Sequence, residues 1–186
     1  SDTAKVASSM LDVIALRVDK HETLEMFAAN SSVPVINALS DLSHPCQILA
    51  DLMTFKENSA NELEKVCWIG DGNNVCNSYV EASKILDFEL SIYCPKEYSP
   101  DPSFLNYAKK NSSFANSREE AAKGADIITT DVWVSMGDEK TKERAFQGYF
   151  VDTGLIENTG KESIFLHCLP AHRGQEITFE LMEHPS

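Results

Sequence analysis

A histidine and a glutamine in the stretch Ser43-His44-Pro45-Cys46-Gln47 are the first side chains whose types and spacing could do chemistry. Pro45 is tolerated in a first helical turn, so a helix is expected to begin here. His44 and Gln47 would then converge near its positive end. Histidine can donate to a carbonyl oxygen and glutamine can accept from an NH2 group, which suits a carbamoyl group. The alternative is that His44 is structural, and Cys46 is expected to pack.

A second cluster, Gly70-Asp71-Gly72-Asn73-Asn74-Val75, follows an apolar stretch in the way a dinucleotide-binding turn does. Val75 stands where the third glycine belongs, and Pro95-Lys96 stand where an acidic residue would hold a ribose. The pattern therefore argues against a nicotinamide site. Asn73 and Asn74 could bind a polar zwitterion, or they could simply cap the next helix.

Two further clusters follow apolar stretches nearer the C-terminal end, in the segments 130–137 and 166–174. Asp131 could pair with a substrate ammonium, or it could belong to an ordinary turn held by Trp133. Cys168, between His167 and His172, could be a nucleophile, a metal ligand or a hydrogen-bonding thiol. The spacing of these groups is poor for zinc, so no metal is expected. Leu169-Pro170 is a candidate cis peptide.

Short apolar stretches alternate with helix-like stretches along the chain, which predicts an α/β fold with parallel sheets and helices on both faces. Strands are expected at 13–16, 33–36, 66–69, 90–94, 127–130 and 163–166, and helices at 2–11, 21–30, 45–57, 78–86, 104–111 and 118–123. Residues 58–61 are the best linker candidate, so we expect domains at 1–57 and 58–186. Ligands bind beyond the carboxyl ends of parallel strands, where Arg17 and the later polar clusters fall.

Composition excludes several classes of protein. The 186 residues carry a net charge of −13, which argues against a nucleic-acid surface. The sequence contains no run of about 18 apolar residues, so no membrane span is expected. The first residues are polar, and no signal-peptide core follows them. The five cysteines are odd in number and include no C-x-x-C pair, so a reducing cytoplasm is expected.

Taken together, the motifs resemble those of the ornithine carbamoyltransferases, within the aspartate/ornithine carbamoyltransferase family. The resemblance rests on His44-Pro45-Cys46-Gln47, Asp71-Gly72-Asn73-Asn74, Asp131-Val132-Trp133-Val134-Ser135-Met136-Gly137 and His167-Cys168-Leu169-Pro170, in this order. It implies transfer of a carbamoyl group from carbamoyl phosphate to L-ornithine, giving L-citrulline and phosphate, without a metal or organic cofactor. It also implies a partial carbamoyl-phosphate domain followed by a Rossmann-like ornithine-binding domain.

The resemblance also implies residue roles. The positions for carbamoyl phosphate are Arg17, His44, Pro45, Cys46, Gln47, Cys168 and Leu169. Those for ornithine are Asn74, Asp131, Ser135 and Met136. The catalytic groups would be Cys168, Asp131, His44 and Arg17. Cys168 would handle a proton rather than form a covalent intermediate, because the substrate amine is itself a nucleophile.

The chain departs from the family pattern in lacking the Ser-Thr-Arg-Thr phosphate motif and the final helix. We therefore expect a chain truncated at both ends, with little turnover by itself. The resemblance further implies a homotrimer at full length, a place in arginine biosynthesis, and neither nucleic-acid nor membrane partners. The alternatives are a carbamoyltransferase for putrescine or N-acetylornithine, which the 131–137 loop argues against, and a non-catalytic paralogue of the same fold.

Overall fold

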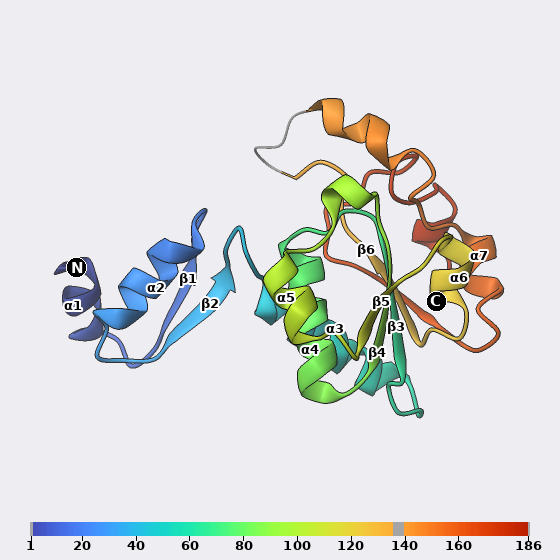
Figure 1. The fold of residues 1–186 in the computed structure, drawn as a ribbon. Coiled ribbons are helices and arrows are strands. Elements are labelled where there is room, and N and C mark those ends of the chain that lie inside the picture. Colours follow the sequence, from blue (N-terminus) through green and yellow to red (C-terminus); the bar gives the residue numbers. More distant parts are fainter. Residues whose placement is uncertain (1, 136–139, 186) are drawn as a thin grey trace.

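The structure, a computed structural model, describes residues 2–135 and 140–185, which form two parallel sheets (Figure 1). The first sheet pairs β1 (Ile14–Arg17) with β2 (Val35–Leu39). The second has the order β5-β4-β3-β6-β7, with strands Lys65–Ile69 (β3), Glu89–Tyr93 (β4), Ser112–Phe114 (β5), Ile127–Thr130 (β6) and Ile164–His167 (β7). All neighbouring strands are parallel, which confirms the predicted fold class.

Helices cover both faces of the five-stranded sheet, as the alternating pattern predicts (Figure 1). The α-helices are Asp2–Ser8 (α1), His21–Ala29 (α2), Pro45–Asn58 (α3), Asn74–Leu86 (α4), Pro102–Tyr107 (α5), Arg118–Ala122 (α6) and Thr153–Glu157 (α7). Three 3-10 helices are Lys96–Tyr98 (η1), Lys140–Phe146 (η2) and Leu181–Glu183 (η3). Within the described ranges, no helix has the length and apolar character needed to cross a membrane.

The central strand β3 shows how the sequence fills both faces of the sheet. Side chains alternate along a strand, so neighbours point to opposite faces. Val66 and Trp68 pack with α3 and α4 in one core cluster. Cys67 and Ile69 pack with α6 and α7 in the other. All four are fully buried, so β3 reads as a continuous apolar run, which is typical of a central parallel strand.

Some element boundaries differ from the predictions. The second strand begins at Val35 rather than at residue 33 because Pro34 has no N–H to donate to a strand partner. The helix predicted at 78–86 begins four residues earlier because the Asn73 side chain accepts from the backbone N–H groups of Val75 and Cys76. The helix predicted at 104–111 is α5, which begins at Pro102 and ends at Tyr107.

The short strand β5 and the helix α7 were not predicted. The strand Ser112–Phe114 has two serines in three residues, so the sequence shows no apolar run there. It lies at the edge of the sheet, where a strand need not be apolar on both faces. The helix Thr153–Glu157 has five residues, too few for a helical period to be visible in the sequence. Its start is set by Asp152, whose carboxylate accepts from the Leu155 N–H at 2.7 Å.

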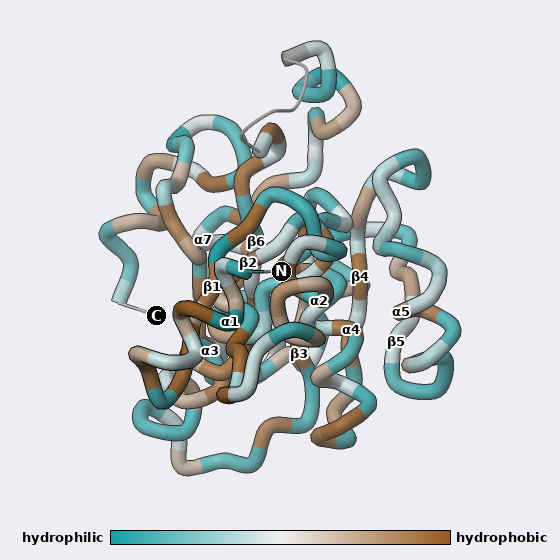
Figure 2. Tube along the Cα trace, turned by 90° about the vertical axis from the view of Figure 1, so that its left-hand side faces the viewer, coloured by the Kyte–Doolittle hydropathy of each residue, from teal (hydrophilic) through white to brown (hydrophobic). Residues whose placement is uncertain are grey.

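The N-terminal sheet buries less apolar surface than the five-stranded one. Residues 2–39 contribute only Ala4, Ile14 and Leu24 to the buried apolar set. Apolar stretches lie at the surface around α1, on the side that faces the viewer in Figure 2. Met10 is 75% exposed and Leu11 is 51% exposed. Because two parallel strands are marginal by themselves, the stable framework for the site is the five-stranded sheet.

Gly72 marks a place where the backbone after β3 passes close to the segment after β4. A Cβ atom at Gly72 would overlap the Pro100 nitrogen and the Tyr98 carbonyl oxygen, which are both backbone atoms. We expect Gly72→Ala to lower the free energy of unfolding by about 1–3 kcal/mol in the natural protein that carries these residues. Urea unfolding measures the loss. Gly154→Ala is the matched control because its Cβ would meet its nearest atom at 3.5 Å, and equal midpoints for the two variants would contradict the expectation.

Candidate active site

A cleft of about 1250 Å³ lies at the carboxyl ends of the strands of both sheets. Its walls come from the segments that follow β1, β2, β3, β4, β6 and β7. The sequence-predicted site residues that line it are Arg17, His44, Gln47, Asn74, Asp131, Ser135, Cys168 and Leu169. Side chains that are far apart in the chain therefore face one solvent-accessible space, as ligand sites in parallel sheets do.

The carboxylate of Asp131 lines this cleft and joins the loops that follow β3, β6 and β7. One oxygen, Oδ2, accepts from the Asn73 side-chain amide at 2.7 Å. The other, Oδ1, accepts from the Cys168 thiol at 3.0 Å and from the Val132 N–H at 2.7 Å. Asp131 is only 8% exposed, so its orientation is held by these donors. Charge-assisted hydrogen bonds of this kind are stronger than neutral ones, and they aim the carboxylate into the cleft.

Burial raises the pKa of the Cys168 thiol well above its ordinary value, and the neighbouring Asp131 charge raises it further. The side chain is therefore a neutral S–H at neutral pH. A thiolate, not a thiol, is the effective nucleophile and metal ligand. Of the three sequence-based alternatives, the structure favours a hydrogen-bonding thiol.

This arrangement predicts a low reactivity for Cys168. In the natural protein, its alkylation by iodoacetamide at pH 8 should be far slower than that of a free thiol, because the thiolate fraction is small. Replacing Asp131 by asparagine removes a negative charge, lowers the thiol pKa and should speed the reaction. Peptide mass spectrometry over time measures both rates, and an alkylation rate at Cys168 equal to that of free cysteine would count against this assignment.

His167 shapes the loop that carries Cys168. The ligating atoms of Asp131, His167 and Cys168 all lie within 4.8 Å of one another, a spacing that metal sites share. However, His167 Nδ1 accepts from the Leu169 N–H at 2.9 Å, and its Nε2 lies 3.2 Å from Glu176. Both ring nitrogens are thus engaged in holding the loop. The peptide bond between Leu169 and Pro170 is cis, as the sequence predicted.

His44 sits at the start of α3 with its ring in the cleft. Burial lowers its pKa below the ordinary value, the Arg17 charge lowers it further, and the Asp131 charge opposes both. The imidazole is therefore neutral at neutral pH and has one N–H to donate. Its Nδ1 atom is buried without a hydrogen-bond partner among the described residues. The backbone N–H of His44 donates to Ser78 Oγ at 2.7 Å, which ties α3 to α4.

The two asparagines after β3 have different roles. Asn73 caps α4 with its side-chain oxygen and holds Asp131 with its side-chain nitrogen. Asn74 does not cap the helix, and its Nδ2 donates to the Ser40 carbonyl at 2.7 Å across the cleft wall. Asn73 was considered from the sequence as a cap or a ligand group but was not among the predicted site residues.

Two predicted residues lie apart from the cleft and one cannot be placed. Pro45 and Cys46 are not among the described residues that line it. Pro45 occupies the first turn of α3, and the Cys46 thiol points to the Asn37 carbonyl at 3.3 Å. These two residues follow His44 directly in the sequence, but successive side chains of a helix point in different directions, so they do not line the cleft. Met136 lies outside the described residues.

An ion pair that the sequence did not indicate lines the cleft. Lys142 Nζ lies 2.6 Å from Asp71 Oδ2, and both side chains are largely buried. The Lys142 ammonium also lies 5.1 Å from the centre of the Tyr98 ring, close enough for a cation–π contact. Lys142 follows a stretch of mixed charges at residues 138–140, so no pattern distinguished it.

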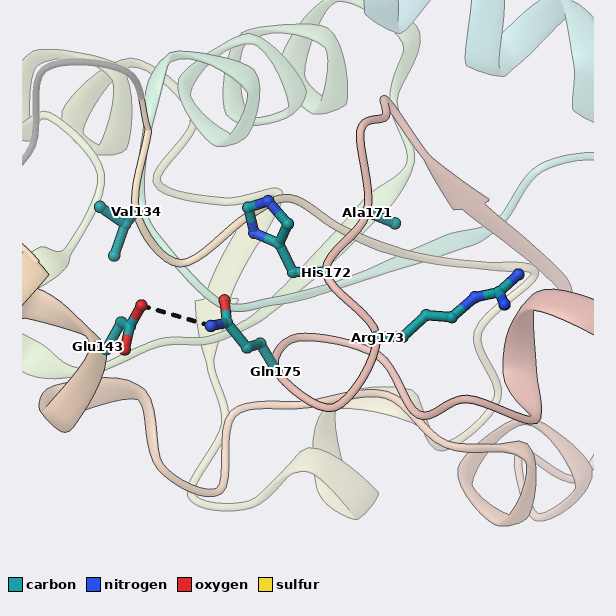
Figure 3. Close-up of a pocket in the computed structure, with 6 residues that line it drawn as sticks. All are labelled: Val134, Glu143, Ala171, His172, Arg173 and Gln175. Atoms are coloured by element: carbon teal, nitrogen blue, oxygen red, sulfur yellow. Dashed lines mark hydrogen bonds between the residues drawn. The ribbon is translucent and has the colours of Figure 1, made fainter.

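A second, open pocket of about 490 Å³ is lined mainly by the loop after β7 (Figure 3). It is lined by Val134, Glu143, Ala171, His172, Arg173 and Gln175. Gln175 donates to Glu143 at 3.4 Å and so joins this loop to η2. None of the sequence-predicted site residues lines this pocket, and we place the chemistry in the larger cleft.

Comparison with protein-family models gives two matches that together span most of the chain. Residues 63–186 match the Asp/Orn binding domain of aspartate/ornithine carbamoyltransferase, and residues 1–57 match its carbamoyl-P binding domain. Among curated relatives, the ornithine carbamoyltransferase of Halorhodospira halophila is 46% identical over 99% of this chain and 63% of its own length. That of Acinetobacter baylyi is 48% identical over 98% of this chain and 61% of its own length.

Solved structures give the same result. The ornithine carbamoyltransferase of Thermus thermophilus matches with a TM-score of 0.88 and 43% identity, over 99% of this chain and 62% of that chain. The anabolic enzyme of Campylobacter jejuni matches with a TM-score of 0.90 and 42% identity, over 98% and 64%. The chain thus spans about three fifths of the length of these relatives. On this evidence the chain belongs to the aspartate/ornithine carbamoyltransferase family.

Proposed function

We propose that the natural protein carrying this chain is an ornithine carbamoyltransferase, which converts carbamoyl phosphate and L-ornithine to L-citrulline and phosphate. The observation that supports this most is the contact of Asp131 with both Cys168 and Asn73 in a cleft that Arg17 and His44 also line. An amine-binding carboxylate and donors for a carbonyl oxygen thus face the same space. The relatives from Halorhodospira halophila and Acinetobacter baylyi are ornithine carbamoyltransferases, which supports the same reaction.

Ornithine would bind on the Asp131 side of the cleft, with Asn74, Ser135 and Met136 completing its contacts. Its side-chain amine must lose a proton before it can attack a carbonyl carbon. Asp131, a largely buried carboxylate that lines the cleft, would orient the ammonium and accept charge as that proton leaves. The neutral Cys168 thiol, fixed by its bond to Asp131, would border the amine without forming a covalent intermediate.

Carbamoyl phosphate would bind on the α3 side, against Arg17, His44, Gln47 and the Leu169 backbone. The carbamoyl oxygen gains negative charge as the amine attacks. A neutral His44 N–H and the Arg17 guanidinium would stabilise that charge, and one such donor contributes about 3 kcal/mol to the transition state. Holding the two substrates together supplies much of the remaining acceleration. The carbon–oxygen bond to phosphate then breaks, and phosphate leaves.

The proposal extends to the organisation of the protein. Residues 1–57 would belong to the carbamoyl-phosphate domain and residues 58–186 to the ornithine domain, in agreement with the two family matches. We propose a homotrimer acting in the cytoplasm in arginine biosynthesis, as the sequence resemblance implies. Because residues 1–186 span about three fifths of the relatives' length, we expect little turnover from these residues alone.

The acceptor is tested by comparing L-ornithine, putrescine and N-acetylornithine side by side in the natural protein, with carbamoyl phosphate as the donor. The proposal predicts a kcat/KM for ornithine that exceeds the other two by several orders of magnitude. Putrescine lacks the α-carboxylate and N-acetylornithine lacks the free α-amine, and Asn74 and Ser135 line the part of the cleft where these two groups would bind. If putrescine or N-acetylornithine gives the higher kcat/KM, that amine is the acceptor and ornithine is not. Turnover with none of the three would overturn the proposed function.

A further inference from the structure

A buried carboxylate, Asp51, lies one turn along α3 from Gln47, outside the described lining of the cleft. One of its oxygens, Oδ1, accepts from Gln47 Nε2 at 2.9 Å. The other, Oδ2, accepts from the Tyr79 hydroxyl at 2.6 Å. Tyr79 belongs to α4 and is fully buried. The carboxylate therefore has a donor on each oxygen, and only one of the two donors, Gln47, also faces the cleft.

We propose that Asp51 is a positioning residue that fixes the orientation of the Gln47 amide and thereby selects carbamoyl phosphate over acetyl phosphate. This inference rests on the proposed function, since it concerns the donor substrate of that reaction. It assigns to Asp51 a role in specificity that acts through Gln47 and needs no contact with the ligand.

The orientation follows from what each group can donate and accept. A glutamine side chain has an oxygen that accepts and a nitrogen that donates, and the two ends are similar in shape. Burial raises the pKa of Asp51, and the hydrogen bonds from Tyr79 and Gln47 oppose this by stabilising the ionised form. In that form the carboxylate can only accept, and the Gln47 nitrogen is the end of the amide that faces it. The Gln47 oxygen is then the atom turned away from Asp51 and available to a ligand in the cleft.

An available oxygen distinguishes the two phosphate donors by hydrogen bonding. Carbamoyl phosphate carries an NH2 group where acetyl phosphate carries a methyl group of similar size. Shape alone gives weak discrimination between groups of equal size, whereas a site built to hydrogen-bond one group rejects an analogue that lacks it. The carbamoyl NH2 can donate to Gln47 Oε1, and the methyl group leaves that acceptor unpaired.

Tyr79 holds the second oxygen of Asp51 and so prevents a simple rearrangement. Burial and the neighbouring Asp51 charge raise the pKa of Tyr79 well above its ordinary value, so its hydroxyl remains a donor. In Asp51→Asn, the new amide would keep its oxygen toward Tyr79 and turn its NH2 toward Gln47. Two NH2 groups cannot pair, so the Gln47 amide would turn over and present its nitrogen to the cleft.

The test measures the dissociation constants of carbamoyl phosphate and acetyl phosphate by calorimetry in the natural protein and in Asp51→Asn. We expect the constant for carbamoyl phosphate to rise by about tenfold and that for acetyl phosphate to change by less than about threefold. Tyr79→Phe is the matched control because it removes the other hydrogen bond to Asp51 and keeps the Gln47 contact. It should change both constants by the same factor and leave their ratio intact.

A folded Asp51→Asn variant with an unchanged ratio would overturn the inference, as would a Tyr79→Phe variant whose ratio falls equally. If Asp51→Asn does not fold, the unmodified protein still gives a test by 15N NMR of the Gln47 side chain. Its NH2 protons should be protected from solvent exchange both before and after either phosphate binds. Protection that appears only with ligand would place the nitrogen in the cleft and overturn the inference. An unmodified protein that binds neither phosphate would instead contradict the proposed function.

Discussion

Replacing Asp131 by asparagine is expected to lower kcat for citrulline formation in the natural protein by roughly 10² to 10⁴-fold. Asparagine has nearly the same shape, and its oxygen can still accept from Val132 and Cys168, so the backbone around position 131 should stay in place. Its NH2 group would face the Asn73 NH2 group, so that one hydrogen bond would be lost. It has no negative charge, however, and cannot hold an ammonium or accept its proton. Asp131 joins Asn73 and Cys168 through its two oxygens, so the variant loses the carboxylate that contacts this thiol. Steady-state kinetics with saturating carbamoyl phosphate measures the loss.

Asp87→Asn provides the control for this substitution. Asp87 follows α4 at the other end of that helix and has a left-handed backbone conformation that asparagine also tolerates. The same chemical change there should leave kcat within about twofold, as surface substitutions usually do. A folded Asp131→Asn variant that retains most of its kcat would contradict the role assigned to Asp131.

Replacing His44 by alanine is the second substitution with a large expected effect. If the neutral His44 N–H donates to the carbamoyl oxygen as negative charge develops, its removal should lower kcat by roughly 10² to 10³-fold. The effect should fall on kcat more than on KM, because the interaction strengthens in the transition state. Kinetics at varied carbamoyl phosphate separates the two parameters.

His172→Ala is the matched histidine control. His172 lines the smaller pocket rather than the cleft, so its removal should leave kcat nearly unchanged (Figure 3). A His44→Ala variant that raises KM with kcat intact would assign His44 to ground-state binding alone. That result would leave Arg17 as the group that stabilises the charge on the oxygen.

The sequence was sufficient to predict which polar clusters gather, because strand ends of a parallel sheet share one edge. Asp131 and Cys168 each follow a short apolar strand, and the structure brings their side chains into contact. The fold class was predicted from the alternation of strand-like and helix-like stretches, which is typical of parallel sheets. Elements with few residues or polar strands, such as β5 and α7, carry too little periodicity to be recognised.

The contacts between loops could not be predicted in the same way. The pairing of Lys142 with Asp71 depends on the position of η2 against the loop after β3, which no repeating pattern encodes. The contact of Gln47 with Asp51 lies at helical spacing and was accessible from the sequence, but the role of Tyr79 required the packing of α3 on α4. Packing of this kind depends on side-chain shapes across elements, so it becomes visible only in the folded chain.

The most direct measurement follows the products of the natural protein given carbamoyl phosphate and L-ornithine together. An arrangement in which an amine held by Asp131 meets a carbonyl polarised by His44 predicts one citrulline for each phosphate released, and almost no phosphate when ornithine is left out. Phosphate release that proceeds without citrulline, at the same rate with or without ornithine, would show that the cleft does not bring the two substrates together.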